Sequence, residues 1–348
     1  MKITLGEVGT YINGYAFKPS DWGTRGLPII RIQNLTNQNI VPNYFDGPYN
    51  PKFEVNKGDI LIAWSGSLGI HIWQKNRALL NQHIFRVEFN KCDIDKMYFY
   101  YAVKHNIHKM LHLTHGATMK HIIKSDFEQI VIPYPSLEVQ ANISKILNYL
   151  EQNIINFRNI LLKLELLIKS RFVEMFGDIT ARGRFKVKRW KDILDILNGR
   201  DYKNVLVNKG GYPVYGSGGI IARASDYICP AGTIIIGRKG SINNPILVNE
   251  KFWNVDTAFG IVPKETINKN YLFYFCKQYN FNRLNKATTL PSLTKQDLLE
   301  IEINIPDLEK QVKFSRFVDQ INKLKSDVQK SINETQLLMD SLMQEYFG

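Results

Sequence analysis

The chain repeats itself, and an internal repeat restricts it to architectures built from two similar units. Residues 130–140 resemble residues 301–311 at an offset of 171 residues, and Phe176-Gly177 and Phe347-Gly348 stand at the same offset. Upstream the offset widens from 174 to 185 in the matched pairs Gly58 and Gly232, Gly66 and Gly240, Ser67 and Ser241, Asn13-Gly14 and Asn198-Gly199, and Gly26 and Gly211. A collinear series of this kind predicts two related globular units whose loops differ in length.

Each half contains a segment of about 40 residues without Pro or Gly, opened by Pro-x-Leu-Glu-x-Gln. Apolar residues recur at spacings of four and three, which is the heptad pattern of a coiled coil. The first seam consists of Ile143, Leu147, Leu150, Ile154, Phe157, Leu161, Leu164 and Ile168. The second consists of Phe314, Val318, Ile321, Val328, Ile332 and Met339. It is less regular, because Lys325 and Thr335 stand where the first has apolar residues.

These segments, residues 136–177 and 307–348, are predicted to form two long spacer helices that pair as an antiparallel coiled coil. About 40 helical residues at 1.5 Å each extend roughly 60 Å. Ser136 is the predicted N-cap of the first helix, and Gly177 is its predicted C-terminal stop. The alternative is two ordinary core helices in two separate domains, which the length and the period disfavour.

The remaining residues, 1–135 and 178–306, are predicted to form two mixed α/β domains, so the fold class is α+β with a pseudo-two-fold repeat. Short β-rich stretches alternate with turns that contain Gly. The predicted strands cover residues 28–32, 59–64, 84–89, 233–236, 259–262 and 301–305. One aromatic helix per domain is predicted, over residues 97–110 and 271–284.

The charge balance indicates a polyanionic partner. The 45 Lys and Arg residues exceed the 32 Asp and Glu residues, which gives a formal net charge of +13 and a pI near 9.4. A protein of this charge is attracted to nucleic acid or to an anionic membrane surface, although a basic surface without a partner is an alternative. No apolar run reaches the roughly 18–20 residues that span a bilayer. Cys92, Cys229 and Cys276 form no zinc or disulfide pattern, so we expect a cytoplasmic protein with reduced thiols.

Several loops carry residues that suit DNA binding, above all the matched loops 64–69 and 237–244. Gly lets the backbone approach a phosphate, Ser and Asn can bond phosphates or base edges, and Arg can pair with guanine. The candidate DNA-binding residues of the first domain are Arg31, Gln33, Asn34, Trp64, Ser65, Ser67, Thr118, Lys120 and His121. Those of the second are Tyr215, Ser217, Arg223, Arg238, Lys239, Ser241, Asn243, Thr289 and Ser292. Taken singly, each fits a tight turn or a surface loop equally well, and the matched placement supports the group.

The sequence shows no catalytic motif. It lacks the Asn/Asp-Pro-Pro-Tyr/Phe string of DNA amino-methyltransferases and the Gly-x-x-x-x-Gly-Lys-Ser/Thr loop of nucleotide-binding proteins. Five histidines cluster between His105 and His121, but no Cys or arranged carboxylate completes a metal site there. We therefore predict no metal, no catalytic residue and no cofactor bound by this chain.

The duplicated order of globular unit and long helix resembles the specificity subunits of type I restriction-modification systems. Leu5-Gly6-Glu7-Val8 before Asn13-Gly14, and Trp190-Lys191-Asp192-Ile193 before Asn198-Gly199, look like the entry to each target recognition domain of that family. Lys57-Gly58-Asp59-Ile60-Leu61 and Gly232-Thr233-Ile234-Ile235 look like its core strand. The resemblance covers nearly the whole chain, although the first half lacks the Trp that opens the second.

The resemblance implies a non-catalytic subunit that reads double-stranded DNA. Each domain would read one half of a split, asymmetric target, and the helices would fix the gap between the half-sites. Two methyltransferase subunits would bring S-adenosylmethionine, and a restriction and translocase subunit would add cleavage. Three alternatives remain at this point: a recognition unit fused to an enzyme, a coiled-coil scaffold whose ends bind proteins, and a DNA-binding protein outside restriction-modification.

Overall fold

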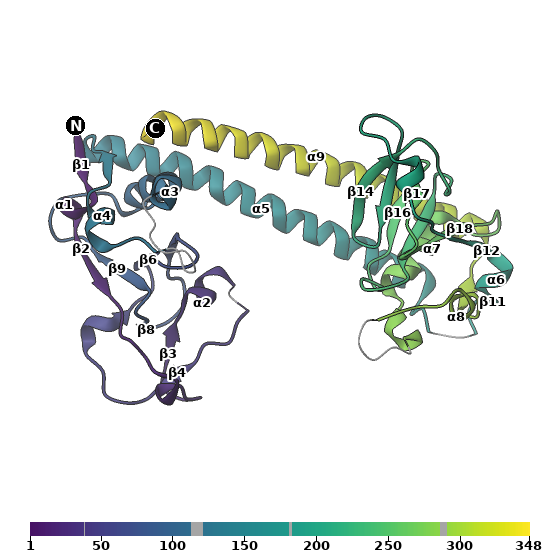
Figure 1. The fold of residues 1–348 in the computed structure, drawn as a ribbon, viewed down its shortest axis with the longest axis horizontal. Coiled ribbons are helices and arrows are strands. Elements are labelled where there is room, and N and C mark those ends of the chain that lie inside the picture. The colour runs from purple at the N-terminus through teal and green to yellow at the C-terminus, as the bar shows by residue number, and fades with distance from the viewer. Residues whose placement is uncertain (38, 113–120, 181–182, 286–290) are drawn as a thin grey trace. The chain divides into compact units, whose positions relative to one another are not determined.

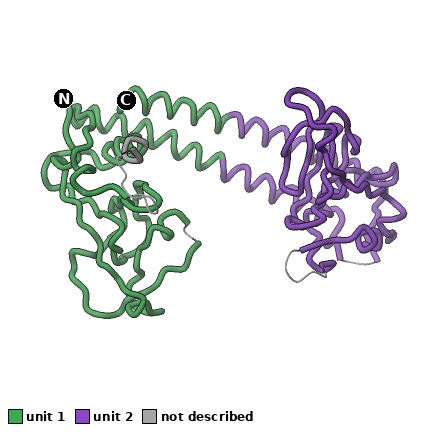
Figure 2. Tube along the Cα trace, viewed as in Figure 1, with its two compact units in different colours: residues 1–157, 331–348 green, residues 158–330 purple. Residues whose placement is uncertain are grey.

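The structure is a computed structural model that describes the whole chain except residues 38, 113–120, 181–182 and 286–290. It divides into two compact units (Figure 2): unit 1 consists of residues 1–157 and 331–348, and unit 2 of residues 158–330. The helices predicted as separate spacers thus belong to both units, because the two halves of each helix pack in different units. Each unit combines one globular part with a portion of each long helix.

Unit 1 is built from short strands with helices on their flanks (Figure 1). Its strands are β1 (Lys2–Thr4), β2 (Thr10–Asn13), β3 (Leu27–Ile30), β4 (Tyr44–Phe45), β5 (Glu54–Val55), β6 (Ile60–Ala63), β7 (Gly69–Ile72), β8 (Ala78–Leu80), β9 (Ile84–Glu88) and β10 (Val131–Pro133). Its helices are α1 (Leu5–Val8), α2 (Ile32–Thr36), α3 (Lys96–His112), α4 (Lys124–Glu128) and the 3-10 turns η1 (Pro19–Asp21) and η2 (Pro51–Phe53).

Unit 2 repeats this order. Its strands are β11 (Lys186–Arg189), β12 (Leu194–Asn198), β13 (Tyr212–Gly216), β14 (Gly219–Ala224), β15 (Thr233–Gly237), β16 (Ile246–Val248), β17 (Trp253–Asn254), β18 (Ala258–Pro263) and β19 (Glu302–Ile305). Its helices are α6 (Trp190–Ile193), α7 (Lys269–Gln278), α8 (Lys295–Leu299) and the turns η3 (Lys203–Val205) and η4 (Phe281–Leu284). The helices α5 (Leu137–Phe176) and α9 (Leu308–Phe347) run through both units.

The sheets confirm the predicted repeat. The order β2-β9-β6-β7 in unit 1 recurs as β12-β18-β15-β16 in unit 2, and the pair β1-β10 recurs as β11-β19. The third sheet differs: both units hold a parallel pair, β3-β8 or β13-β17, with an antiparallel strand outside it, β4 or β14, but β14 is longer than β4 and only unit 1 has a fourth strand, β5. The two units therefore share a framework and diverge beyond that parallel pair.

Close backbone approach explains the repeated Asn-Gly string. A Cβ on Gly14 would lie 2.1 Å from the carbonyl oxygen of Asn81, and one on Gly199 would lie 1.9 Å from that of Val255. Any side chain would collide with these carbonyls, so only glycine fits at the end of β2 and β12. The repeat preserves a steric requirement at this point of the framework.

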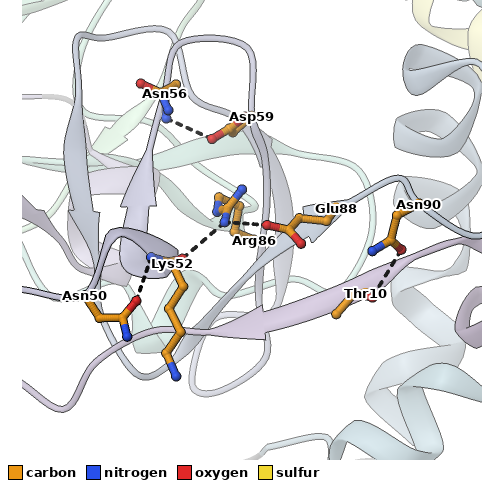
Figure 3. A network of polar contacts seen from close by, with 8 residues as sticks. All are labelled: Thr10, Asn50, Lys52, Asn56, Asp59, Arg86, Glu88 and Asn90. Carbon is orange, nitrogen blue, oxygen red and sulfur yellow. Dashed lines mark hydrogen bonds and ion pairs between the residues drawn. The ribbon is translucent and has the colours of Figure 1, made fainter.

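The segment before β6 in unit 1 is held by polar contacts (Figure 3). Arg86 on β9 donates from Nη2 to the carbonyl of Lys52 at 3.1 Å and to Oε1 of Glu88 at 2.8 Å. Asp59 accepts at Oδ2 from the backbone N–H of Asn56 at 2.8 Å and closes the turn that leads into β6. These bonds tie η2 to β9 and close the turn that leads into β6.

The long helices match their predicted bounds within two residues. Ser136 Oγ accepts from the backbone N–H of Val139 at 3.4 Å, as expected of an N-cap, and Gly177 ends α5 with a φ of +80°. Every predicted seam residue is buried or half-buried. The predicted helix over residues 271–284 is shorter than expected, because α7 ends at Gln278 and Asn280 caps the separate turn η4. Among the described residues, no helix is both long and apolar enough to cross a membrane.

Within unit 2 the two helix portions are antiparallel. Glu165 on α5 accepts from Nζ of Lys325 on α9 at 2.7 Å, while Phe172 on α5 packs 5.5 Å from the ring of Phe314. The partner number falls as the α5 number rises, as an antiparallel pair requires. Lys325, which interrupts the apolar seam, thus has a carboxylate partner.

The last Phe of each helix packs on a tyrosine of a globular part. The ring centroid of Phe176 lies 4.8 Å from that of Tyr271 in unit 2, and that of Phe347 lies 5.2 Å from that of Tyr98 in unit 1. Both phenylalanines are buried. Each tyrosine also donates its hydroxyl to a carbonyl of the strand before a long helix, Tyr98 to Pro133 and Tyr271 to Asn304. The repeated Phe-Gly string therefore marks where one half of the chain completes the core of the other half's unit.

The final Gln of Pro-x-Leu-Glu-x-Gln clamps each long helix to the globular part before it. Gln140 is fully buried, donates to the carbonyl of Pro135 at 2.9 Å, and accepts from the backbone N–H of Asp95 at 2.9 Å. Gln311 is also fully buried and makes the equivalent bonds, to Pro306 at 2.7 Å and from Asn268 at 2.8 Å. Asp95 and Asn268 precede α3 and α7, so one side chain ties three elements together.

Replacing either glutamine by alanine is expected to destabilise the protein. Each change leaves a partly or fully buried backbone N–H and carbonyl without their side-chain partner, which costs up to about 1–3 kcal/mol per group. Urea unfolding of Gln140→Ala and Gln311→Ala should show this loss, whereas Gln152→Ala, at an exposed position of α5, should not. Equal midpoints for all three variants would contradict the clamp.

The Glu165–Lys325 pair is expected to make stability depend on pH. Burial alone would raise the pKa of Glu165, but the hydrogen bond and charge of Lys325, with the charge of Lys277, outweigh it and lower that pKa from 4.5. The stabilisation is then complete above about pH 4.5 and is lost as the pH falls through the lowered pKa. Because the pair is partly exposed, Lys325→Met should destabilise by at most about 1 kcal/mol at pH 7.

Urea unfolding across pH 3 to 7 checks this, with Lys323→Met, an exposed neighbour on α9, as the control. The difference between Lys325→Met and wild type should shrink towards acidic pH. A difference that is independent of pH would mean that Lys325 acts through packing alone.

Candidate nucleic-acid interface

Matched loops follow the central strands β6 and β15 and are tied in the same way. Trp64 accepts at its backbone carbonyl from the N–H of Ile122 at 3.0 Å, and Arg238 accepts from that of Leu293 at 2.9 Å. One residue further on, Ser65 bridges to His121 and Lys239 bridges to Ser292. Four of the predicted residues in these two loops thus occupy two equivalent pairs of positions, and the structure brings His121 and Ser292 to them from about 50 residues away along the chain.

Glycine sets the path of each loop. Gly66 has a φ of +67° and Gly240 a φ of +77°, and neither has an atom within 4 Å of the place where a Cβ would stand. Conformation rather than crowding therefore requires glycine here. The neighbouring hydroxyls of Ser67 and Ser241 are exposed in both loops.

In unit 1 the loop carries an aromatic residue. The Trp64 ring stacks on Phe85 with centroids 5.7 Å apart and an interplanar angle of 23°, and its Nε1–H donates to Oδ1 of Asn13 at 3.2 Å. His83 and His121 lie against it, at 5.5 and 6.4 Å between ring centroids. Together these side chains line a mainly apolar pocket of about 510 Å³. Burial, with the positive charge of Arg31, lowers the pKa of His83 and so favours the neutral form of this histidine.

In unit 2 a cation takes the place of the tryptophan. The guanidinium of Arg238 lies 5.8 Å from the ring of Phe259, which stands on β18 as Phe85 stands on β9. Its Nη1 is 3.5 Å from the carbonyl oxygen of Asp256. Arg238 and the adjacent Lys239 are both exposed. The same framework position therefore offers a flat indole in one unit and a fork of N–H donors in the other.

Away from these loops the candidates of unit 1 divide into exposed and internal residues. Arg31 lies over the ring of Trp22 at 4.8 Å, and Gln33 is exposed on α2. Asn34 is a correction to the prediction. Its side chain is 5% exposed, accepts from the N–H of Arg31 and donates to the carbonyl of Ile40, so its amide stabilises the α2 region. Ser65, at 3% exposed, is likewise internal.

In unit 2, Tyr215, Ser217 and Arg223 lie on or beside the β13–β14 hairpin. Tyr215 is half-buried with its ring 5.3 Å from Phe252, and Arg223 is exposed and donates to the carbonyl of Gly211 at 3.2 Å. Asn243 is exposed but accepts at Oδ1 from the backbone N–H of Phe281 at 2.7 Å, which gives it a structural role.

Some predicted residues are not placed, and some residues of the site were not predicted. Thr118, Lys120 and Thr289 lie outside the described residues. Sequence reasoning missed His83 and Phe85, since only the folded sheet brings β9 beside the loop after β6. In the part of the chain that the structure describes, no group of three or more His, Cys, Asp and Glu side chains could hold a metal ion.

The two loops are expected to contribute differently to DNA binding. Arg238→Ala removes a cation, so it should weaken binding to a DNA duplex. The slope of the logarithm of the affinity against the logarithm of the salt concentration should become less steep by about one. Trp64→Ala should weaken binding without changing that slope, because it removes no charge. DNA titrations at several salt concentrations check this. Lys186→Ala is the control, because it removes a cation on β11, outside both loops. An unchanged affinity for both variants would exclude these loops from the interface.

Comparison with known proteins agrees with the repeated fold. A family model described as the type I restriction modification DNA specificity domain matches residues 1–166 and again residues 183–335. The specificity subunit of the type I restriction enzyme MjaVIII from Methanocaldococcus jannaschii is 26% identical over 327 residues, which cover 79% of this chain and 75% of that one. The EcoBI specificity subunit of Escherichia coli is 28% identical over 152 residues, or 43% of this chain and 32% of that protein.

Solved structures share the fold across the full length. The S subunit of a type I restriction-modification system from M. genitalium aligns with a TM-score of 0.66 at 17% identity, over 100% of this chain and 96% of that one. A chain from a structure of type I R-M complex assembly aligns with a TM-score of 0.60 at 16% identity, over 99% and 97%. Because the family model matches both halves, the chain belongs to the family of type I restriction-modification DNA specificity proteins.

Proposed function

We propose that this chain is the DNA-recognition subunit of a type I restriction-modification complex and that each unit reads one half of a split target. Family membership supports the role in DNA specificity. The single observation that supports a separate half-site for each unit is that one position of the shared framework holds Trp64 in unit 1 and Arg238 in unit 2. Because the framework is common and the side chains differ, the two half-sites should differ in sequence.

The two loops suit different contacts with DNA. A guanidinium can donate two parallel hydrogen bonds to O6 and N7 of guanine, which discriminates against a wrong base by about 1–3 kcal/mol. An indole offers an apolar face to bases or sugars and one N–H donor, and Asn13 already accepts from that donor. Lys239 and Ser241 stand next to Arg238 and suit phosphate contacts, which position a protein without reading sequence.

The long helices are suited to set the distance between the two half-sites. Each has 40 residues and passes from one unit into the other. A continuous helix resists stretching, because each residue is bonded to the next turn. We propose that α5 and α9 together fix the gap between half-sites at about one turn of DNA, roughly 34 Å.

Chemistry would come from partner subunits. We propose two methyltransferase subunits that carry S-adenosylmethionine and flip the target adenine out of the duplex, and a restriction subunit that adds cleavage. This chain would supply recognition and no catalytic group. The names of its relatives, which are specificity subunits of restriction enzymes, support this assignment.

Mapping of modified adenines tests the proposal. The chain is expressed with the methyltransferase subunit encoded beside it, and the host DNA is sequenced for methylated adenine. A split, asymmetric motif with a fixed gap is expected, and it should disappear when this chain is omitted. Turnover by the isolated chain with S-adenosylmethionine, or a soluble complex that modifies no DNA, would overturn the proposal.

A further inference from the structure

In unit 2 the outer strand of the third sheet, β14, forms a tight hairpin with β13. β14 is the edge strand of the sheet β14-β13-β17, and it pairs only with β13 within that sheet. At the corresponding place in unit 1, β3 pairs with the two-residue strand β4 instead. Residues 205–207 cover the outer edge of β14 only near its end, at Arg223 and Ala224. The half of the hairpin next to the turn is a ribbon whose outer edge along β14 no described residue covers, while its β13 strand pairs with β17.

Two isoleucines stand exposed on this ribbon. Ile220 is 57% exposed and Ile221 is 55% exposed. The pairing of β14 with β13 shifts register here: Ile220 pairs with Tyr215 and Ala222 with Val214, so Ile221 lies at the irregularity between them. Proteins normally protect such edges with charge or cover, because exposed β-branched edges promote aggregation. An unprotected pair of isoleucines indicates a surface that a partner covers.

The excess of positive charge around the hairpin favours DNA as that partner. Residues 199–245, which contain the hairpin and the Arg238 loop, hold six Lys or Arg and two Asp or Glu. The matching region of unit 1, residues 14–71, holds five and four. A Cβ on Gly237 would lie 3.1 Å from that of Ser217, so the hairpin turn sits directly beside Arg238. The exposed isoleucines thus belong to a hairpin whose turn adjoins the loop that carries Arg238 and Lys239.

The turn is also slim. Gly218 and Gly219 follow Ser217, and no atom lies within 4 Å of a Cβ placed on either glycine. The major groove of DNA is about 12 Å wide and admits a two-stranded β-ribbon. In that groove the 5-methyl group of thymine is the apolar feature that an aliphatic side chain can contact.

We propose that the β13–β14 hairpin enters the major groove of the half-site read by unit 2, with Ile220 and Ile221 packed on thymine methyl groups. The inference rests on the proposed function and adds to it a base preference and two specificity-determining residues. It also explains why the two units diverge at this sheet, since a reading element is free to change while the framework is not.

The experiment replaces thymine by uracil, which removes only the 5-methyl group. Once the target is mapped, the complex of this chain with its methyltransferase is titrated with target duplexes that carry uracil in one half-site. With wild type, uracil in the half-site of unit 2 should weaken binding about fourfold for each buried methyl group. The double variant Ile220→Ser and Ile221→Ser should bind the thymine duplex as weakly as wild type binds the uracil duplex, and it should not respond to uracil.

Controls separate the possible failures. Val187→Ser on β11, another exposed apolar position of unit 2, should respond to uracil as wild type does. If the wild-type complex modifies no DNA, the proposed function fails. If it modifies DNA but the serine variant keeps the full uracil effect, or if the half-site contains no thymine, the inference about the hairpin is overturned. Loss of the methyltransferase from the purified variant would also overturn it, because the hairpin would then be a protein contact.

Discussion

The structure depends on the way each long helix is held at both ends. At its start, a buried glutamine bonds the helix to the globular part that precedes it, as Gln140 does for α5. At its end, a phenylalanine completes the core of the other unit, as Phe176 does beside Tyr271. Hydrophobic packing and a satisfied polar clamp thus act at opposite ends of one rigid element. The motifs Pro-x-Leu-Glu-x-Gln and Phe-Gly occur in both halves of the sequence because they make these two contacts.

The division between framework and reading surface follows from the same principle. Framework positions must satisfy buried polar groups and close backbone approaches, so they recur in both halves, as Gly14 and Gly199 do. Loop positions meet solvent or a ligand, so Trp64 and Arg238 can differ without loss of the fold. The third sheet, where unit 2 has its hairpin, differs between the units in the length and number of its strands.

What the sequence predicts well is local and periodic. The helix bounds follow from a proline before and a glycine after each apolar seam, and the repeat predicts the equivalence of the two domains. What it misses depends on tertiary contacts. The buried amide of Asn34, the structural bond of Asn243, and the place of His83 beside Trp64 require the folded sheets, because no periodicity joins residues that are distant along the chain. The exposure of Ile220 is hidden for the same reason, since a β-branched residue in a strand is ordinarily a core residue.

The ion pair between Glu165 and Lys325 breaks the internal symmetry. At the offset of 171 residues, Lys325 corresponds to Ile154 and Glu165 corresponds to Gln336. If two copies of α5 paired in the same antiparallel arrangement, Glu165 would face an isoleucine, and in a pair of α9 copies Lys325 would face a glutamine. Only the heterotypic pair joins opposite charges. A duplicated chain, whose halves otherwise resemble one another, thereby gains a small bias towards pairing α5 with α9 over pairing two like helices from separate copies.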